Sequence, residues 1–274
     1  MKVSIISVNY NNGRYLDKHL SSINAQTYQN WEHILIDGKS SDMSLYVIGR
    51  HPDHRRIIIS EPDNGIYDAM NKGLSLATGD YLIFLNGDNH FFSDGVLEQF
   101  IIAERKLPKQ INLHWVVYGD AIIVGEPPVH DVKRYWFSSV LKNRKIFGWM
   151  PAHQGTFFPM YIKGRYSYAL QYRIASDYDL ICRLLSDPNV QFNYFSCFVG
   201  CSIDGGVSNK STKNRIATLR ECYKIFCEYS KINKVIPAPL FYSFRLMWKV
   251  LQICKNTAYK FRLKMVIMFN RTNF

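Results

Sequence analysis

The stretch that decides the fold is SEPDNGIYDAMNKGLSLATGDYLIFLNGDN, residues 60–89. Apolar residues recur at helical spacing from Ile66 to Ala77, which predicts a helix that Asn64 caps and a Thr-Gly-Asp turn ends. Residues 81–85 form a short apolar run that is typical of a buried strand. A polar loop follows that strand directly and consists of Asn86, Gly87, Asp88 and Asn89.

Strand-like and helix-like segments also alternate upstream of this stretch. The predicted strands cover residues 3–8, 33–36 and 56–60, and the predicted helices cover residues 15–25 and 41–49. This alternation predicts an α/β fold with a mixed, mainly parallel sheet flanked by helices. Ligands of such sheets bind outside the carboxyl ends of the strands, where this sequence collects polar residues. The glycine-rich dinucleotide fingerprint and the P-loop are both absent, so a nucleotide would be held in another way.

The composition indicates one elaborated domain with a sizeable core, because the 274 residues are 47% hydrophobic and 20% charged. No run of about 18 apolar residues occurs and the N-terminal residues show no cleavage signal, so we expect a cytoplasmic protein that does not span the membrane. The six cysteines lie in the second half and form no CxxC pair. We therefore expect reduced cysteines, with neither a zinc site nor a disulfide framework.

The net charge of +12 points to an acidic partner, which can be nucleic acid, anionic lipid or a phosphorylated substrate. After Glu228 the chain has nine lysines and arginines and no acidic residue. The positive charge therefore lies away from the predicted sheet ends, and no recognised nucleic-acid motif accompanies it. We expect no nucleic-acid partner.

Several ordered motifs resemble the family 2 glycosyltransferases with the GT-A fold, in particular those that build O-antigen, capsular or exopolysaccharide repeat units. Besides residues 60–89, the resemblance rests on SIISVNYNNGRYLDKHLSSINAQTYQNWEHILIDGKSSD at residues 4–42, HQGTFF at 153–158 and IASDYDL at 174–180. It implies a GT-A catalytic domain over residues 1–205, with a nucleotide-sugar half up to about residue 120 and an acceptor half from 121 to 205. A helical, basic C-terminal region would follow over residues 206–274. The implied activity is metal-dependent, inverting hexosyl or N-acetylhexosaminyl transfer.

For the donor, the resemblance places Asp88 on the second aspartate of the family's D-x-D signature, where it would reach a Mn²⁺ or Mg²⁺ ion on the diphosphate. Asn86 takes the first position, which contacts ribose. Without the resemblance, this tetrapeptide is an ordinary turn. Asp37 would accept from the imide N–H of uracil and Tyr10 would cover the same ring, which favours a UDP-sugar. The remaining residues of the predicted donor site are Asn9, Asn64, Gly65, Asn71 and Lys72, the last being either a phosphate ligand or a solvated lysine.

For the chemistry, the resemblance assigns Asp177 as the base that deprotonates the acceptor hydroxyl, with Asp179 as the alternative. Ser176 stands where the family carries an acidic neighbour, and Ser176 or Asp177 can equally be a helix N-cap. Three further residues are placed near the acceptor: His153, as a metal ligand or a sugar contact, Gln154 and Asp120. Asp120 ends a predicted strand, and an exposed loop carboxylate is the alternative interpretation.

The tail, residues 240–269, predicts one or two helices with a polar and basic stripe beside an apolar surface. The stripe contains Arg245, Lys249, Gln252, Asn256, Lys260 and Lys264, and the apolar surface contains Phe244, Met247, Trp248, Leu251, Phe261 and Met265. Such helices suit an anionic membrane surface. We expect a peripheral protein on the inner face of the cytoplasmic membrane that acts on a saccharide or lipid-linked saccharide. Packing against the catalytic domain or homodimer formation is the alternative use of the tail. A catalytically weak nucleotide-sugar-binding protein is the first alternative function, and a basic nucleic-acid-binding protein, which the net charge would fit, is the second.

Overall fold

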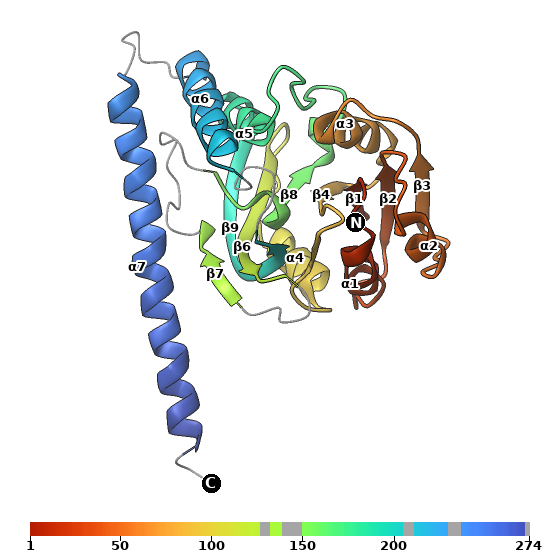
Figure 1. Ribbon diagram of the computed structural model, residues 1–274, viewed down its shortest axis with the longest axis horizontal. Coiled ribbons are helices and arrows are strands. Elements are labelled where there is room, and N and C mark those ends of the chain that lie inside the picture. Colours follow the sequence, from red (N-terminus) through yellow and green to blue (C-terminus); the bar gives the residue numbers. More distant parts are fainter. Residues whose placement is uncertain (127–131, 139–149, 205–210, 230–236, 272–274) are drawn as a thin grey trace.

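The computed structural model describes residues 1–126, 132–138, 150–204, 211–229 and 237–271 (Figure 1). In the last of these segments it describes side chains up to Lys260, except those of Ala238, Phe244 and Trp248. The domain boundary predicted at residue 205 therefore falls at the edge of the described residues.

The described residues form a mixed nine-stranded sheet in the order β3-β2-β1-β4-β8-β6-β9-β5, with β7 paired to β6. The strands β1 to β4 are parallel to one another, β8 runs antiparallel to both β4 and β6, and β6 and β9 are parallel. The strand bounds are β1 Val3–Asn9, β2 Trp31–Asp37, β3 Arg56–Ser60, β4 Tyr81–Phe84, β5 Asn89–Phe91, β6 His114–Val124, β7 Val132–Trp136, β8 Thr156–Pro159 and β9 Val190–Ile203.

Helices pack against both faces of this sheet. Their bounds are α1 Gly13–Asn24, α2 Ser44–Gly49, α3 Ile66–Leu76, α4 Val96–Arg105, α5 Ser176–Ser186, α6 Thr212–Tyr229 and α7 Ala238–Arg271, with short 3₁₀ turns η2 His153–Gly155 and η3 Met160–Ile162. The side chains of α3 and α5 pack on one face and those of α1 and α4 on the other. The α/β class expected from the alternating segments is confirmed.

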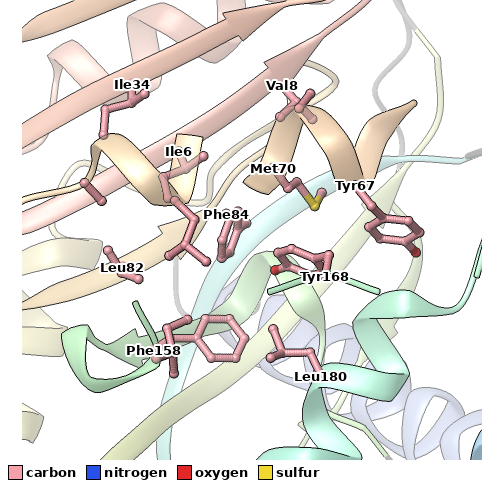
Figure 2. Close-up of a cluster of buried hydrophobic side chains, with 14 of the residues drawn as sticks. Ile6, Val8, Ile34, Tyr67, Met70, Leu82, Phe84, Phe158, Tyr168 and Leu180 are labelled. Carbon is pink, nitrogen blue, oxygen red and sulfur yellow. The ribbon is translucent and has the colours of Figure 1, made fainter. Parts of the chain in front are cut away.

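The two faces follow from the alternation of side chains along each strand. In β1, Ile6 and Val8 point toward α3, while Val3 and Ile5 point to the opposite face. Figure 2 shows the α3 side of the core, where Phe84 of β4 lies near Tyr168. Because the parallel strands are buried on both sides, every residue of β1 and β2 is buried.

The elements predicted for residues 1–85 agree with the structure to within about three residues at each end. The predicted cap is wrong: Gly65 holds the N-cap position of α3, with φ of 114°, a backbone conformation that favours glycine. Asn64 instead lies one residue earlier and contacts Asp68. The predicted strand end at Asp120 is also wrong, because β6 continues to Val124.

The tail forms one helix, α7, about 50 Å long at 1.5 Å per residue, which runs beside β7 and α6 (Figure 1). Gln252 and Asn256 of its polar stripe face the domain, as the alternative of packing against the catalytic domain expects. Gln252 exchanges two hydrogen bonds with the backbone of Phe137, and Asn256 exchanges two with Tyr135. The predicted stripe and apolar positions Phe244, Trp248, Phe261, Lys264 and Met265 lie outside the described side chains. No helix in the described part of the chain is long and apolar enough to cross a membrane.

Candidate active site

The predicted donor residues gather at one edge of the sheet, where β1, β2, β3 and β4 end. The register pairs Asn9 with Asp37 and Asp37 with Ser60, which places these three residues side by side. The turn η2 enters the same edge, because β8 runs antiparallel to β4 and starts where β4 ends. The fold therefore brings segments from residues 9 to 155 together at the edge where α/β proteins bind ligands.

Asp37 joins the ends of three strands. Its carboxylate accepts hydrogen bonds from Asn9 Nδ2 (2.8 Å), Ser40 Oγ (2.5 Å), Ser40 N (2.9 Å) and Ser60 Oγ (2.7 Å). Burial alone would raise the pKa of Asp37, but these donors outweigh it and the pKa is lowered. The side chain is fully buried, and its oxygens hold the loops through these protein donors; the direct bond to uracil stays a prediction.

Tyr10 is 63% exposed directly after β1 and presents its ring beside the loop that follows Asp37. A Cβ atom on Gly38 would come within 3.2 Å of the Tyr10 ring and 2.5 Å of Asp63 Oδ2. Glycine at this position therefore permits the close approach of the ring and the carboxylate. An exposed aromatic ring over a rigid loop is suited to covering a planar base.

The loop after β4 contains oxygens without a protein partner. Asn86 Oδ1 and Asn9 Oδ1 are both buried and accept no hydrogen bond, and a Cβ on Gly87 would lie 2.9 Å from Asn9 Oδ1. Burial also raises the pKa of the nearby Asp88 carboxyl. Hard cations prefer such oxygen ligands, and Mg²⁺ sites commonly combine one or two carboxylates with substrate phosphates. The loop therefore fits a divalent cation that a diphosphate would help to bind.

Asp88 also lines a cavity of about 150 Å³ at the start of α1, together with Arg14 and Lys18. A larger pocket of about 740 Å³ lies where β6 and β9 begin, at the opposite edge of the sheet. Its lining includes Lys163 and Arg165 but none of the predicted site residues. The described residues contain no group of three or more histidine, cysteine, aspartate or glutamate side chains that could hold a metal together.

The predicted donor residues of α3 mostly have protein partners. Asn71 exchanges two hydrogen bonds with the backbone of Tyr168, at 2.7 and 2.9 Å, and so holds that segment. Lys72 pairs with Glu61 at 2.7 Å and donates to the Pro62 carbonyl at 2.9 Å, and its side chain stays partly exposed to solvent. Asn64 and Gly65 are exposed at the start of the helix.

Asp177 lies in the first turn of α5, beside the start of α3. Its Oδ1 accepts from Tyr178 N (2.8 Å) and lies 3.5 Å from the Tyr67 hydroxyl. Burial raises the pKa of Asp177 to about 6, against lowering contributions from Tyr178 and then Arg245. The N-cap position belongs to Ala175, so the capping interpretation of Ser176 and Asp177 is wrong. A carboxylate titrating near neutral pH is suited to general base catalysis.

His153 and Gln154 lie in η2 at the same edge. His153 Nε2 bonds Tyr168 Oη at 2.8 Å, and the ring stacks on Phe84 with centroids 5.5 Å apart. Burial lowers the pKa of His153 to about 4, so the ring is neutral at pH 7. Gln154 packs against Gly200, where a Cβ would lie 2.7 Å from the Gln154 carbonyl oxygen.

Asp120 and Asp179 are buried and paired. Asp120 accepts from Ser138 N (2.7 Å) and Tyr194 Oη (2.9 Å), so the exposed-loop interpretation is wrong. Asp179 forms an ion pair with Arg183 at 2.7 Å and is 2% exposed. Both carboxylates therefore hold protein segments together, and Asp177 is the better placed base.

Two residues absent from the predicted site contribute to it. Tyr67 Oη donates to the Ile174 carbonyl at 2.6 Å, and Glu221 of α6 accepts from the backbone N–H groups of residues 173–175. Tyr67 lies within the quoted stretch of residues 60–89, where its aromatic side chain could have suggested a site role. Nothing near Glu221 in the sequence signals its contact, because 46 to 48 residues separate the partners.

Comparison with known proteins agrees with this geometry. Residues 4–198 match the sequence model described as "Glycosyl transferase family 2". The chain is 32% identical over 213 residues to a PGL/p-HBAD biosynthesis glycosyltransferase of Mycobacterium bovis, covering 75% of this chain and 78% of that protein. It is 32% identical over 127 residues to the putative glycosyltransferase EpsE of Bacillus subtilis, covering 45% of this chain and 44% of that protein.

Solved structures share the fold at low sequence identity. A mannosyltransferase from Pyrobaculum calidifontis, in complex with GDP-Man and Mn²⁺, superposes with a TM-score of 0.59 at 14% identity, covering 88% of this chain and 68% of that one. Residues 1–349 of S. aureus TarS, in complex with UDP, give a TM-score of 0.55 at 13% identity with the same coverage. The chain spans 41% of the longer TarS chain. The GT-A fold expected from the sequence is confirmed.

Proposed function

Because this chain belongs to glycosyl transferase family 2, we propose that it is an inverting glycosyltransferase that moves a hexose or N-acetylhexosamine from a UDP-sugar to a saccharide acceptor. The observation that carries the proposal is Asp177, a carboxylate with a pKa near 6 at the edge of the sheet where the donor residues gather. Asp37 and Asp120 have their oxygens engaged by protein donors, which leaves Asp177 as the base.

The donor site would recognise the nucleobase of the sugar donor mainly by its shape. Tyr10 would cover one face of the ring, and the loop fixed by Asp37 would offer backbone groups to its edge. The complexes of the two structural relatives contain UDP in one case and GDP-Man in the other, so a nucleoside diphosphate sugar is common to both. We choose uridine because the sequence resembles polysaccharide transferases that use it.

The cation would bind Asp88 and the diphosphate, with Asn86 beside it. It would supply charge stabilisation for the departing nucleoside diphosphate. Arg14 and Lys18, which line the cavity at Asp88, add positive charge on the same side. Asn86 in place of an aspartate leaves one carboxylate in the loop, which favours a site that forms only when the diphosphate brings its own oxygens.

In the transfer step, Asp177 takes the proton of the acceptor hydroxyl while that oxygen attacks the anomeric carbon. The bond from the anomeric carbon to the phosphate oxygen breaks, and the nucleoside diphosphate leaves with the electron pair. Attack from the opposite face inverts the centre. A positioned base contributes about 10² to 10⁴-fold to such a step.

The experiment measures donor binding and transfer for the wild type, Asp177→Asn and Asp88→Ala. We expect Asp177→Asn to bind UDP-sugar normally and to lose about 10² to 10⁴-fold in turnover. Asp88→Ala should lose the enhancement of donor binding by Mn²⁺. Retained turnover in Asp177→Asn would refute the assignment of Asp177 as the catalytic base. Unchanged metal dependence in Asp88→Ala would refute the assignment of Asp88 as a metal ligand. Wild-type protein that binds donor without transferring sugar would favour the alternative, a catalytically weak nucleotide-sugar-binding protein.

For the acceptor, we propose a lipid-linked saccharide at the inner face of the cytoplasmic membrane, reached through α7. With Gln252 and Asn256 bound to the domain, α7 turns apolar side chains outward: Leu246, Met247, Val250, Leu251 and Ile253 are 40% to 63% exposed. Exposed Lys249 and Lys260 flank this outward face. An apolar helix face with flanking cations, on a tail without acidic residues, suits the surface of an anionic bilayer. The mycobacterial relative is named for PGL biosynthesis, which supports a lipid-linked acceptor.

Co-sedimentation with vesicles containing anionic lipid tests this surface with the full chain. We expect the combined substitution Leu246→Ser, Val250→Ser and Ile253→Ser to reduce binding at least tenfold. The control Ile111→Ser removes an apolar side chain that is 94% exposed elsewhere and should bind as the wild type does. Wild-type protein that stays in the supernatant at low salt would refute the membrane role, and elution as a dimer that the triple substitution dissociates would favour self-association.

A further inference from the structure

The helix that carries Asp177 is held from outside the part of the chain that the family model matches. That part ends at residue 198, whereas Glu221 lies in the middle of α6. Glu221 Oε1 accepts from Arg173 N at 3.0 Å, and its Oε2 accepts from Ile174 N at 3.0 Å and Ala175 N at 2.9 Å. These three residues lead directly into α5.

The local sequence does not supply this support. A helix leaves its first backbone N–H groups without intrahelical partners, and a side chain at the N-cap position commonly binds one of them. Here the N-cap residue is Ala175, which has no polar side chain, and Ser176 Oγ is buried without a partner. Glu221 does not replace this cap: it accepts from the N–H groups of Arg173, Ile174 and Ala175, which precede the helix, and its negative charge suits the positive end of the helix dipole.

The peptide groups of Ile174 are fixed on both sides. Glu221 holds its N–H, and Tyr67 Oη donates to its carbonyl at 2.6 Å. Tyr67 also lies 3.5 Å from Asp177 Oδ1, so the same hydroxyl sets the distance between α3 and the carboxylate. Only two residues, Ala175 and Ser176, separate Ile174 from Asp177, which is too short a link to allow independent movement.

Charged and titratable groups from four elements face Asp177. They are Tyr67 of α3, Tyr168 before α5, Cys222 of α6 and Arg245 of α7. Arg245 contacts the Tyr178 ring at 5.7 Å, and its Nη1 is buried without a hydrogen-bond partner. Cys222 of α6 and Arg245 of α7 lie beyond residue 198, so these two C-terminal helices form one wall around the Asp177 carboxylate.

We infer that Glu221 is a positioning residue for sugar transfer, which fixes the backbone before α5 and so holds the Asp177 carboxylate against the acceptor hydroxyl. The inference rests on the proposed function, because it takes Asp177 as the base. This role of Glu221 makes α6 part of the catalytic apparatus. The donor loops are held by Asp37 and do not depend on Glu221.

The experiment compares Glu221→Gln with Glu228→Gln in the full chain. Glu228 is a matched control because it lies on the same helix and accepts from Tyr172 Oη at 2.8 Å, one residue before the clamped backbone. Steady-state transfer is measured from pH 5 to 8, together with donor affinity and melting temperature. Glu221→Asp, which keeps the charge on a shorter side chain, is the second variant.

We expect Glu221→Gln to lower kcat tenfold or more while donor KM changes less than twofold. The acid limb of the kcat profile should move from about pH 6 to lower pH, because a looser helix start exposes the Asp177 carboxyl to water and weakens the burial that raises its pKa. Glu228→Gln should keep kcat and the pH profile, and Glu221→Asp should recover part of the loss.

A Glu221→Gln variant with kcat within twofold of Glu228→Gln, or with an unmoved acid limb, would overturn the inference. A loss of donor affinity in Glu221→Gln as large as its loss of kcat would also overturn the inference, since it would indicate general damage to the protein. Failure of the proposed function gives a different result: the wild type transfers no sugar, or Asp177→Asn turns over normally.

Discussion

Asp37 and Asp177 lie at the ligand-binding edge of the sheet and are held in opposite ways. Asp37 is buried beneath four hydrogen-bond donors, and its pKa is lowered although burial alone would raise it. Asp177 has one short hydrogen bond, from Tyr178, and burial raises its pKa to about 6. The supply of donors, more than burial itself, separates a carboxylate that organises loops from one that can exchange a proton.

The regions around the two aspartates differ in the same way. On the donor side, the partners of Asp37 come from the neighbouring strands and their loops, all within residues 9–60. On the base side, the segment before α5 is held by Tyr67 from α3 and Glu221 from α6. The donor side is therefore supported by adjacent sequence, and the base side depends on helices brought in from distant parts of the chain.

The largest expected effect contrasts the same substitution at the two aspartates. Asp37→Asn removes a charge that several donors stabilise and should destabilise the protein by about 3 kcal/mol at pH 7. Asp177→Asn should stabilise it by up to about 3 kcal/mol, because a rise in pKa from 3.8 to about 6 costs that much once the carboxyl is ionised. Urea denaturation at pH 7 measures both.

The pH dependence of stability checks the sign of each effect. Folded Asp177 binds its proton more tightly than the unfolded chain does, so its cost grows as the pH rises from about 4 to 6 and is small at pH 4. The gain from Asp177→Asn should therefore fall below about 1 kcal/mol at pH 4. The pKa of Asp37 is lowered, so its contribution is present above the unfolded pKa and the loss in Asp37→Asn should persist at pH 5. Shifts of the same sign at pH 7 would refute the contrast.

A smaller effect is expected at Tyr10, which tests the donor side alone. Tyr10→Ala removes an exposed ring that would cover the base, and stacking of a base on an aromatic ring is worth about 1 to 3 kcal/mol. We expect donor affinity to fall about tenfold with little change in kcat. Tyr46→Ala is the control, because Tyr46 is 67% exposed on α2 and is not one of the predicted site residues. Equal effects of the two substitutions would exclude Tyr10 from the donor site.

Much of the donor side could be predicted from sequence because its signals are local. The apolar period of residues 66–77 and the run at 81–85 specified α3 and β4, and Asp88 follows that strand directly. The protein partners of Asp37 could not be predicted, because its donors Asn9 and Ser60 lie 28 and 23 residues away and only the strand register reveals that they surround it. In the sequence, an aspartate in a loop looks the same whether its oxygens are free or already accept hydrogen bonds from protein donors.

The base side was less predictable for the same physical reason. Asp177 was found through a motif, but its support by Glu221 depends on packing between α5 and α6, which leaves no local pattern. The polar stripe of α7 was recognised, but the sequence left open which way it faces, and Gln252 and Asn256 bind the open edge of β7. An amide can satisfy an unpaired strand edge as well as water can, and periodicity does not distinguish the two.

The smallest expected effect is a coupling energy that measures whether the two sides are independent. Glu221 and Tyr67 hold opposite ends of the Ile174 residue, so Glu221→Gln and Tyr67→Phe should not add in their effects on the free energy of unfolding, with a coupling of about 0.5 to 1 kcal/mol. Glu221→Gln and Ser60→Ala share no partner and should add within about 0.5 kcal/mol. Double-mutant cycles by urea denaturation give both values. Equal coupling in the two cycles would mean that the sheet transmits strain between the sides. Coupling confined to Tyr67 would mean that the backbone before Asp177 is held as a separate unit, whose position the chain can adjust without disturbing the donor loops.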